Sequence, residues 1–326
     1  MTGKATVVKN AGSHFLLSLL PEWAPFPAVL RGKVRLSGSD ATNPVAVGDI
    51  VTYSIGFNPY PSAPGAVSET ARATLEHPAT IISVEPRRNY IIRRSTNLSR
   101  QSHVIAANLD RAFLIATLYF PEIKLPFLDR FLVTCEVYGI PVTIVLNKVD
   151  LFREDFPDAL ADFHRIYESA GYPILETSAR TGEGIAELRS LAKDHVVLAA
   201  GESGVGKSSL IRAMDTSLDP KIGKISLAHL QGRYTTSRYE MYPLSSGGFI
   251  IDSPGLRGFG LVDLEKEEIS KYFPEMLRVT DNCYYVPCTH THEPECAVKA
   301  ALDSGTVSPE RYASYLGMLE DDKKFR

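Results

Sequence analysis

Apolar residues up to about residue 96 fall in short runs separated by turn residues, a pattern typical of small β-barrels. The predicted strands are Lys4–Val8, Phe15–Leu20, Ala28–Leu36, Asp49–Ile55 and Thr80–Val84. Five short strands in this space predict an N-terminal β-barrel of the OB-fold type, with an SH3-like barrel as the alternative. Two stretches rich in Pro, Ser and Gly, Ser37–Pro44 and Asn58–Ser68, predict loops.

After residue 96 the pattern changes to an alternation of apolar strands and amphipathic helices. The predicted strands are Arg111–Leu118, Pro141–Leu146, Pro173–Glu176, Val196–Ala200 and Phe249–Ile251, and the predicted helices are Leu125–Tyr138, Phe156–Ala170 and Gly184–Ala192. This alternation predicts a parallel sheet wrapped by helices. With a cysteine-rich stretch and a helical tail at Pro309–Glu320, the chain reads as a multidomain α/β protein with domains at 1–96, 97–266 and 267–326.

Composition narrows the class of protein without defining it. The 326 residues are 44% hydrophobic and 22% charged, and the net charge is −3, so any binding to nucleic acid must come from local basic patches. No run approaches the 18 apolar residues of a membrane span, and no signal peptide pattern opens the chain. We therefore expect a cytoplasmic protein with no membrane partner, and nothing in the sequence indicates an obligate dimer.

The residues from Gly201 to Ser208 match the phosphate-binding pattern G-x-x-x-x-G-K-[ST] between a predicted strand and a predicted helix. Glycines let successive backbone N–H groups point at phosphate oxygens, Lys207 can reach the β- and γ-phosphates, and the Ser208 hydroxyl can bind Mg²⁺. The predicted phosphate contacts are Gly201, Glu202, Ser203, Gly204, Val205, Gly206, Lys207, Ser208 and Ser209.

Two further motifs stand at predicted strand ends and favour guanine. Asn147-Lys148-Val149-Asp150 is an N-K-x-D, in which the Asp carboxylate can accept hydrogen bonds from guanine N1–H and N2–H₂. Asn147 can contact the base and the Lys148 stem can cover its face. In the Glu176-Thr177-Ser178-Ala179 segment, Ser178 and Ala179 can supply a backbone N–H to guanine O6.

The remaining parts of a GTPase follow the phosphate loop. Asp252-Ser253-Pro254-Gly255 matches D-x-x-G, in which Asp252 can hold Mg²⁺ through water and the Gly255 N–H can sense the γ-phosphate. Between the two motifs, Thr235 or Thr236 can complete the Mg²⁺ shell; the sequence does not choose between them. Lys207, Ser208, Thr235, Thr236, Asp252 and Gly255 are thus the predicted catalytic set.

The order of these motifs is unusual, because N-K-x-D precedes the phosphate loop. GTPases ordinarily begin with the phosphate loop, so the sequence predicts a circularly permuted P-loop GTPase domain. Permutation is tolerated since the termini of a compact domain usually lie close together. The chain then leaves this domain just after the D-x-x-G motif.

Three of the four cysteines lie in the next segment, as Cys283-x₄-Cys288-x-His290-x₅-Cys296. Three thiolates and one imidazole form a closed tetrahedral shell for one structural Zn²⁺. His292 is a rival ligand to His290, and a set of buried cysteines without metal is the alternative. Cys135 lies on the apolar face of a predicted helix and belongs to the core.

Two basic clusters in and beside the barrel predict contacts with RNA phosphates. One contains Arg31, Lys33 and Arg35, and the other contains Arg87, Arg88, Arg93, Arg94 and Arg100. The alternative is a solvated charged edge. We name Arg31, Arg35, Arg87, Arg88, Arg93 and Arg94 as the candidate RNA contacts.

Together these features make the chain resemble the RsgA (YjeQ) family of circularly permuted small ribosomal subunit biogenesis GTPases. The resemblance rests on Arg31–Arg35, Pro44–Asp49, Pro86–Asn89, the permuted motif order and the C-T-H-x-H-E-P-x-C-A-V stretch at Cys288–Val298. It implies a late-acting factor that binds the small (30S) subunit and its rRNA near the decoding region. There it would hydrolyse GTP slowly until the ribosome stimulates it, and then leave.

The chain departs from the family pattern in the switch segments. Tyr234 stands where the family usually has a histidine near the attacking water, and Leu256 follows Gly255 where many GTPases carry a water-positioning glutamine. A tyrosine hydroxyl, with an ordinary pKa of about 10, is not a base at neutral pH. We therefore expect slow intrinsic GTP hydrolysis.

Three other functions fit parts of the sequence. An RNA-binding module with a vestigial nucleotide site is disfavoured by the intact Lys207, Ser208 and Asp252. A metabolic P-loop kinase or ATPase is disfavoured by the N-K-x-D motif. A GTPase acting on the large subunit or on tRNA is separated from our prediction only by the family resemblance.

Overall fold

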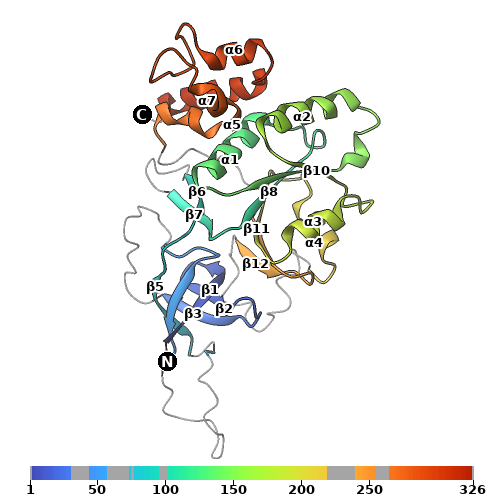
Figure 1. The fold of residues 1–326 in the computed structure, drawn as a ribbon. Helices are drawn as coiled ribbons and strands as arrows, with labels where there is room; N and C mark the ends of the chain where they lie inside the picture. Colours follow the sequence, from blue (N-terminus) through green and yellow to red (C-terminus); the bar gives the residue numbers. More distant parts are fainter. Residues whose placement is uncertain are drawn as a thin grey trace, which may run out of the picture.

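We describe the chain from a computed structural model, in which residues 2–30, 44–56, 73–74, 77–94, 102–218, 239–253 and 264–324 are described. The molecule has three parts arranged in a row (Figure 1). A β-barrel lies at one end, a helix-covered sheet lies in the middle, and a group of helices lies at the other end. Among the helices that these ranges contain, none is long and apolar enough to cross a membrane.

The barrel is formed by β1 (Thr2–Ala11), β2 (His14–Ser18), β3 (Phe26–Leu30), β4 (Ile50–Ser54) and β5 (Ala79–Val84). Its strands pair in the order β1-β2-β3-β5-β4, and β4 pairs again with β1 to close the ring. Inward-facing apolar residues such as Val7, Leu17 and Ile81 are fully buried in its core. The closed five-stranded order agrees with the predicted OB-fold.

The central sheet contains β8 (Arg111–Ala116), β9 (Val142–Asn147), β10 (Ile174–Thr177), β11 (Val196–Ala200), β12 (Glu240–Pro243) and β13 (Phe249–Asp252). The strand order is β10-β9-β8-β11-β13-β12, parallel except for β12. The strands are buried on both faces and rich in branched apolar residues, as expected for parallel strands covered by helices.

Helices cover both faces of this sheet. Helices α1 (Leu125–Val137) and α2 (Pro157–Ala170) pack on one face, and α3 (Ile185–Ala192) and α4 (Lys207–Met214) pack on the other. A short 3₁₀ helix, η1 (Val149–Leu151), follows β9. The carboxyl ends of β9, β10, β11 and β13 meet at one edge, which is where the predicted nucleotide motifs stand.

The barrel and the central sheet are joined through β1. This strand pairs with β2 and β4 inside the barrel, and Lys9 near its end pairs with Glu240 of β12. Lys9 Nζ also lies 3.0 Å from both carboxylate oxygens of Glu240. The eleven strands of the barrel and the central sheet therefore form one continuous hydrogen-bonded sheet.

A hairpin that the apolar pattern did not predict links the two parts. It is made of β6 (Tyr90–Arg94) and β7 (Ser102–Ala107), and its buried Ile91 and Ile105 belong to the core shared with α1 and α2. The boundary predicted at residue 96 falls between these paired strands. Polar residues occupy one end of each strand, Arg93-Arg94 in β6 and Ser102-His103 in β7, which leaves apolar runs too short to predict a strand.

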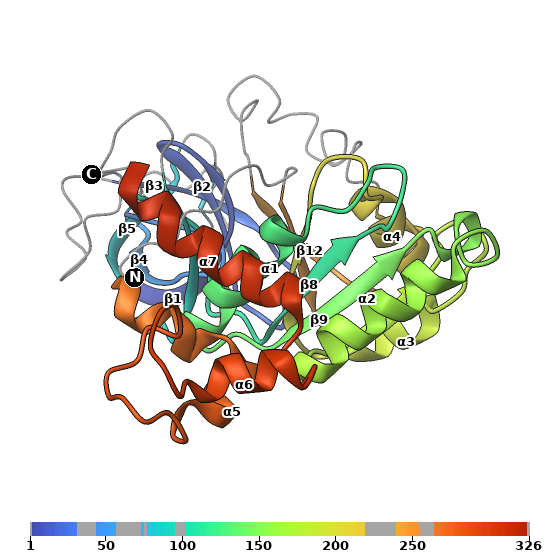
Figure 2. The same ribbon diagram turned by 90° about the horizontal axis from the view of Figure 1, so that it is seen from above.

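The C-terminal part contains the 3₁₀ helix η3 (Lys266–Tyr272), α5 (Pro274–Thr280), α6 (Ala297–Asp303) and α7 (Pro309–Lys324). Seen from above, α7 lies along the central part, and the segment between α5 and α6 projects outward (Figure 2). The core of this part includes Val133 of α1, so it packs directly on the central domain.

A buried ion pair network joins the C-terminal part to the central domain. Arg311 of α7 is fully buried and contacts Asp129 of α1 at 2.8 Å and Glu275 of α5 at 2.7 Å. The ring of Phe273 lies 4.6 Å below its guanidinium carbon. These contacts hold α7 against α1, so the C-terminal part packs on the central domain in a fixed position.

Candidate functional site

The predicted phosphate loop connects β11 to α4 in a tight curl. Gly201 and Gly206 have φ angles of +151° and +97°. A Cβ at Gly201 would lie 2.3 Å from the carbonyl oxygen of Ile115, and one at Gly206 would lie 2.4 Å from Nδ2 of Asn147. Only glycine fits these two positions. The amino end of α4 then opens toward the space where an anion would sit.

Lys207 is buried at the start of α4. Its Nζ donates to the carbonyl oxygens of Gly201 and Glu202, at 2.9 and 2.7 Å. Burial lowers the pKa of this amine, while the nearby carboxylates of Asp252 and Glu202 oppose the shift. The ammonium group thus lies over the curl of the loop, where phosphate oxygens would replace the carbonyls as partners.

Asn147 ends β9 and ties three segments together. Its Nδ2 donates to the carbonyl oxygen of Val205 at 2.8 Å, and its Oδ1 accepts from the N–H of Ala179 at 3.3 Å. Lys148 follows with a φ of +67°, and its Nζ donates to the carbonyl oxygens of Phe120 and Gly204. The N-K-x-D and T-S-A segments therefore meet against the phosphate loop.

Asp150 carries the carboxylate predicted to recognise guanine. Ser178 Oγ donates to one of its oxygens at 2.5 Å and Arg180 Nε donates to the other at 2.7 Å. Against the raising effect of partial burial, these hydrogen bonds lower the pKa of the Asp150 carboxyl. It is therefore an anion at neutral pH, with two donors already aimed at it. Arg180 was not predicted; its side chain is 72% exposed, so it can leave Asp150 to an incoming base.

Asp252 ends β13 beside the phosphate loop. Its Oδ1 is buried and has no hydrogen-bond partner among the described residues. Burial raises the pKa of this carboxyl to about 6, with Lys207 opposing and Glu240 adding to the shift. The next residue, Ser253, donates to the carbonyl oxygen of Ala199 at 2.7 Å and fixes the strand end. A buried carboxylate oxygen without a donor, beside the phosphate loop lysine, suits a hydrated Mg²⁺.

Several predicted site residues lie outside the described residues. They are Arg31, Lys33, Arg35, Arg100, Tyr234, Thr235, Thr236, Gly255, Leu256 and the Asn58–Ser68 loop. Ser203, Gly204 and Ser209 are exposed at the rim of the phosphate loop.

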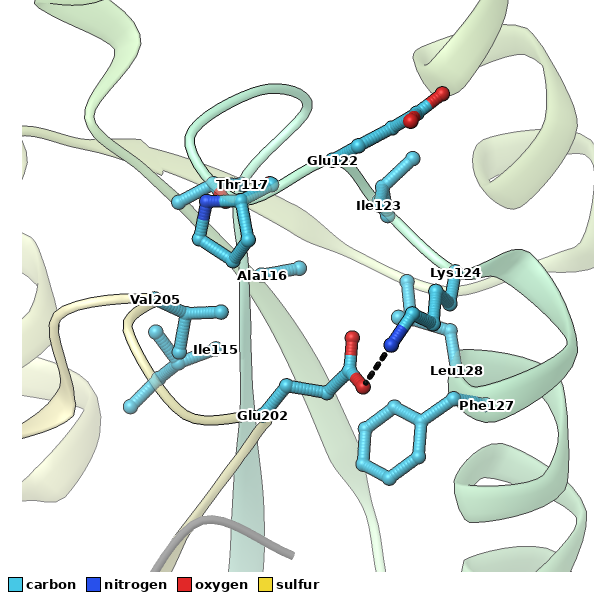
Figure 3. A pocket seen from close by; sticks show the side chains of 11 residues that line it. Ile115, Ala116, Thr117, Glu122, Ile123, Lys124, Phe127, Leu128, Glu202 and Val205 are labelled. Carbon is cyan, nitrogen blue, oxygen red and sulfur yellow. Dashed lines mark hydrogen bonds and ion pairs between the residues drawn. The ribbon is translucent and has the colours of Figure 1, made fainter. Parts of the chain in front are cut away.

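A small pocket adjoins the phosphate loop on the side of α1 (Figure 3). Glu202 reaches across it to Lys124, whose Nζ lies 3.1 Å from Glu202 Oε1. Lys124 is the residue that precedes α1. The pocket therefore joins the phosphate loop to the start of the helix that carries Asp129.

The predicted metal ligands come together as one group. The ligand atoms of Cys283, Cys288, His290 and Cys296 all lie within 4.8 Å of one another. His290 Nδ1 lies 3.7 Å from the Cys283 sulfur and 3.4 Å from the Cys296 sulfur. A tetrahedral Zn²⁺ with ordinary bond lengths sets this edge at about 3.6 Å, so the donor set fits such an ion.

The backbone around His290 is fixed by two tyrosines of α7. Tyr312 donates its hydroxyl hydrogen to the carbonyl oxygen of His290 at 2.6 Å, and Tyr315 does the same to Thr289 at 2.6 Å. His292, the rival ligand in the sequence, is exposed and lies outside this group. Cys135 is fully buried in the core of α1, as predicted.

Among the described arginines of the basic clusters, Arg87 and Arg88 differ in surroundings. Arg87 is only 8% exposed and forms a bidentate pair with Asp49, at 2.7 Å for each contact. The Arg87 guanidinium, which was predicted from the sequence to contact RNA phosphates, is instead paired with Asp49. Arg87 is therefore a structural residue of the barrel. Arg88 contacts Asp110 at 2.6 Å but is 60% exposed. Arg93 and Arg94 are backbone members of β6.

Comparison with known proteins gives a consistent result. Residues 84–262 match the RsgA GTPase family. The small ribosomal subunit biogenesis GTPase RsgA of Bacteroides fragilis is 43% identical over 321 residues, covering 98% of this chain and 97% of that protein.

Two solved structures share the fold. The crystal structure of YjeQ from Thermotoga maritima has a TM-score of 0.73 and 30% identity, and the alignment covers 98% of each chain. The crystal structure of YloQ, a circularly permuted GTPase, has a TM-score of 0.67 and 24% identity over 100% of this chain and 96% of that one.

Proposed function

This chain belongs to the RsgA family of GTPases, and on that basis we propose that it hydrolyses GTP during late maturation of the small ribosomal subunit. The observation that carries the proposal is the joining of four separate motifs at one sheet edge. Asn147 contacts both the phosphate loop and Ala179, while Asp252 and Lys207 influence each other's charge. On the small subunit, GTP cleavage to GDP and phosphate would drive release of the protein.

We assign the guanine base to the space beside Asp150, Lys148 and Ala179. Asp150 would accept from guanine N1–H and N2–H₂, and Ser178 would keep the carboxylate oriented. Lys148 is held at its amine by the carbonyl oxygens of Phe120 and Gly204, which leaves its alkyl stem to cover the base. Arg180 would move aside when the base binds.

We assign the phosphates to the curl of the loop and to Lys207. The backbone N–H groups of Gly204 to Ser208 would bind phosphate oxygens, and Lys207 would exchange its two carbonyl partners for the β- and γ-phosphates. Bound Mg²⁺ supplies charge neutralisation to these phosphates. Ser208 and Asp252 would hold it, together with Thr235 or Thr236, while Gly255 would contact the γ-phosphate.

The Asp150→Asn variant should lose its preference for guanine. An amide cannot accept from both N–H groups, so we expect affinity for GTP to fall by about tenfold or more, the scale of one or two lost charge-assisted hydrogen bonds. Affinity for xanthosine triphosphate should rise, since xanthine offers a carbonyl where guanine has an amine. Competition binding with labelled GDP measures both. Arg180→Ala is the matched control, because it removes a partner of Asp150 but not the acceptor; equal guanine selectivity in D150N and the wild type would refute the assignment.

Hydrolysis by the isolated protein should be slow and should increase when small subunits are added. Tyr234 and Leu256 stand at the two positions where a water-positioning histidine or glutamine is expected, so we expect a group on the ribosome to complete the site. Single-turnover measurements with purified small subunits, large subunits and no subunits test this expectation. Fast turnover by the protein alone, or equal stimulation by large subunits, would contradict it.

We propose that the metal of the C-terminal part is one structural Zn²⁺. Atomic absorption should then give one zinc per chain, and Cys296→Ser should lose it and expose Tyr312 and Tyr315 to solvent. Cys135→Ala, which removes a thiol from the core of α1, is the control and should keep full zinc content. Retention of zinc by C296S, or the presence of another metal in the native protein, would contradict the proposal.

The arrangement also supports the remaining expectations. The barrel, with Arg88 exposed and Arg31, Arg35, Arg93 and Arg94 nearby in sequence, is the proposed rRNA-binding part. We propose that the protein acts as a cytoplasmic monomer with separate barrel, GTPase and zinc-binding domains. The β6–β7 hairpin is better placed with the GTPase domain, because its buried residues belong to that core.

A further inference from the structure

The segment between α5 and α6 exposes an apolar tip. Tyr284, Tyr285 and Val286 are 71%, 45% and 89% exposed, and the two tyrosine rings meet edge to face with centroids 5.0 Å apart. Figure 2 shows this segment projecting away from the body of the molecule. Aromatic side chains are seldom left this exposed without a partner, since they are enriched where proteins meet other molecules.

The tip is anchored at both ends by the metal site. Cys283 immediately precedes it and Cys288 follows Pro287, so both ends belong to the ligand group. In addition, the N–H of Tyr284 donates to the carbonyl oxygen of Glu295 at 3.4 Å, which places Glu295 beside the tip. A tip held in this way binds a partner with little loss of conformational entropy.

The charged residues of the segment that carries the tip are acidic, and Lys299 of α6 contacts this segment at the carbonyl oxygen of Glu293, at 3.4 Å. From Asp281 to Cys296 the sequence contains three carboxylates, Asp281, Glu293 and Glu295, and no Lys or Arg. Three thiolates on Zn²⁺ leave one further net negative charge at the ligand group. The whole region 264–326 has twelve Asp or Glu against eight Lys or Arg, an excess of four negative charges.

The barrel has the opposite balance. Residues 1–96 contain six Asp or Glu against ten Lys or Arg, an excess of four positive charges. The two ends of the molecule therefore attract different surfaces, and only the barrel end suits the phosphate backbone of rRNA.

We propose that the tip of Tyr284, Tyr285 and Val286 docks on a Lys- and Arg-rich protein surface of the small subunit, and not on rRNA. This inference rests on the proposed function and names a partner class for the zinc-binding part. Guanidinium groups stack on tyrosine faces, and the carboxylates of Asp281 and Glu295 complete their recognition. An RNA partner would bring phosphates against this negative region.

Charge reversal distinguishes a basic protein partner from an RNA partner, because the affinity should change in opposite directions. In the full-length protein, Asp281→Lys combined with Glu295→Lys should weaken binding to small subunits at least tenfold if the partner is basic. The same variant should bind more tightly if the partner is RNA, which would overturn the proposal. Asp303→Lys, an exposed charge reversal at the end of α6, is the matched control and should change affinity little. Zinc content and GDP affinity of each variant confirm that the fold is retained.

Photocrosslinking identifies the partner directly. A benzophenone amino acid replaces Tyr284, and the protein is bound to purified small subunits with a non-hydrolysable GTP analogue and irradiated. The expected product resists ribonuclease and contains a basic ribosomal protein. A crosslink to rRNA alone, or none while the protein remains bound, overturns the proposal for the tip but not the proposed function. Failure of the full-length protein to bind small subunits would overturn both.

Discussion

Replacement of Arg311 by methionine should destabilise the docking of α7 by about 3–5 kcal/mol, the effect of removing one partner from a buried ion pair. Methionine keeps much of the length of the side chain but leaves the carboxylates of Asp129 and Glu275 without their cation. Both carboxylates are almost completely inaccessible to solvent. Hydrogen exchange of the α1 and α7 backbone amides would measure the change, since the loss is local to this contact.

The network explains why the expected loss is large. Burial raises the pKa of the Asp129 carboxyl, with Arg311 opposing the shift, so the ionised form depends on the arginine. Without that cation, Asp129 would take up a proton or the helices would separate to admit water. Either response weakens the contact between the C-terminal part and the GTPase domain.

Two controls test this explanation. Arg165→Met removes an exposed arginine that pairs with Asp162 and, at 3.7 Å, with Glu310 of α7. Because both pairs are solvent-exposed, the loss of stability should stay below about 1 kcal/mol. Adding Asp129→Asn and Glu275→Gln to R311M removes the uncompensated charges and should recover part of the loss. An R311M variant with unchanged exchange protection in α7 would show that the network is not what fixes this helix.

Replacement of Lys207 by alanine should reduce GTP hydrolysis by about 10²–10³-fold, the range for loss of one group that stabilises transition-state charge. The effect on binding of GDP should be smaller, because the loop glycines and their N–H groups remain. The variant also frees the carbonyl oxygens of Gly201 and Glu202 from their present donor. Single-turnover hydrolysis and nucleotide affinity, measured on the same preparation, separate the two effects.

Lys124→Ala provides the matched control for Lys207. Both lysines contact Glu202, but Lys124 pairs with its carboxylate at the rim of the pocket and Lys207 with its carbonyl oxygen inside the loop. Loss of the exposed pair should alter the hydrolysis rate less than about fivefold, as expected for a pair of about 1 kcal/mol or less. Equal losses in the two variants would mean that Lys207 acts through the shape of the loop and not through the phosphates.

Much of the candidate site was predictable, because its chemistry depends on residues close together in sequence. Gly201 and Gly206 are needed because a Cβ at either position would clash with Ile115 or Asn147, and this local constraint produces a recognisable spacing. The parallel strands bring N-K-x-D, T-S-A and D-x-x-G to one edge by topology alone. The four metal ligands lie within 14 residues of each other, so their grouping also followed from sequence.

Contacts between distant segments were not predictable in the same way. Arg311 and Asp129 are separated by 182 positions, so no local pattern pairs one with the other. Arg87 looked like part of a basic patch because its partner, Asp49, lies 38 positions earlier. Single-sequence patterns describe which groups are charged, whereas burial is decided by the packing of elements far apart in the chain.

The sharing of β1 between two sheets has a mechanical consequence. Strand β12 lies between residues 219–238 and 254–263, which contain the predicted switch threonines and Gly255. Because Lys9 is hydrogen-bonded in register with Glu240, a tilt of the barrel strains the strand between both switch segments. Movement of the barrel would therefore reach β12 through the end of β1. Binding of the barrel to a rigid surface would then strain β12 and the switch segments on either side of it. No contact between that surface and the phosphates would be needed.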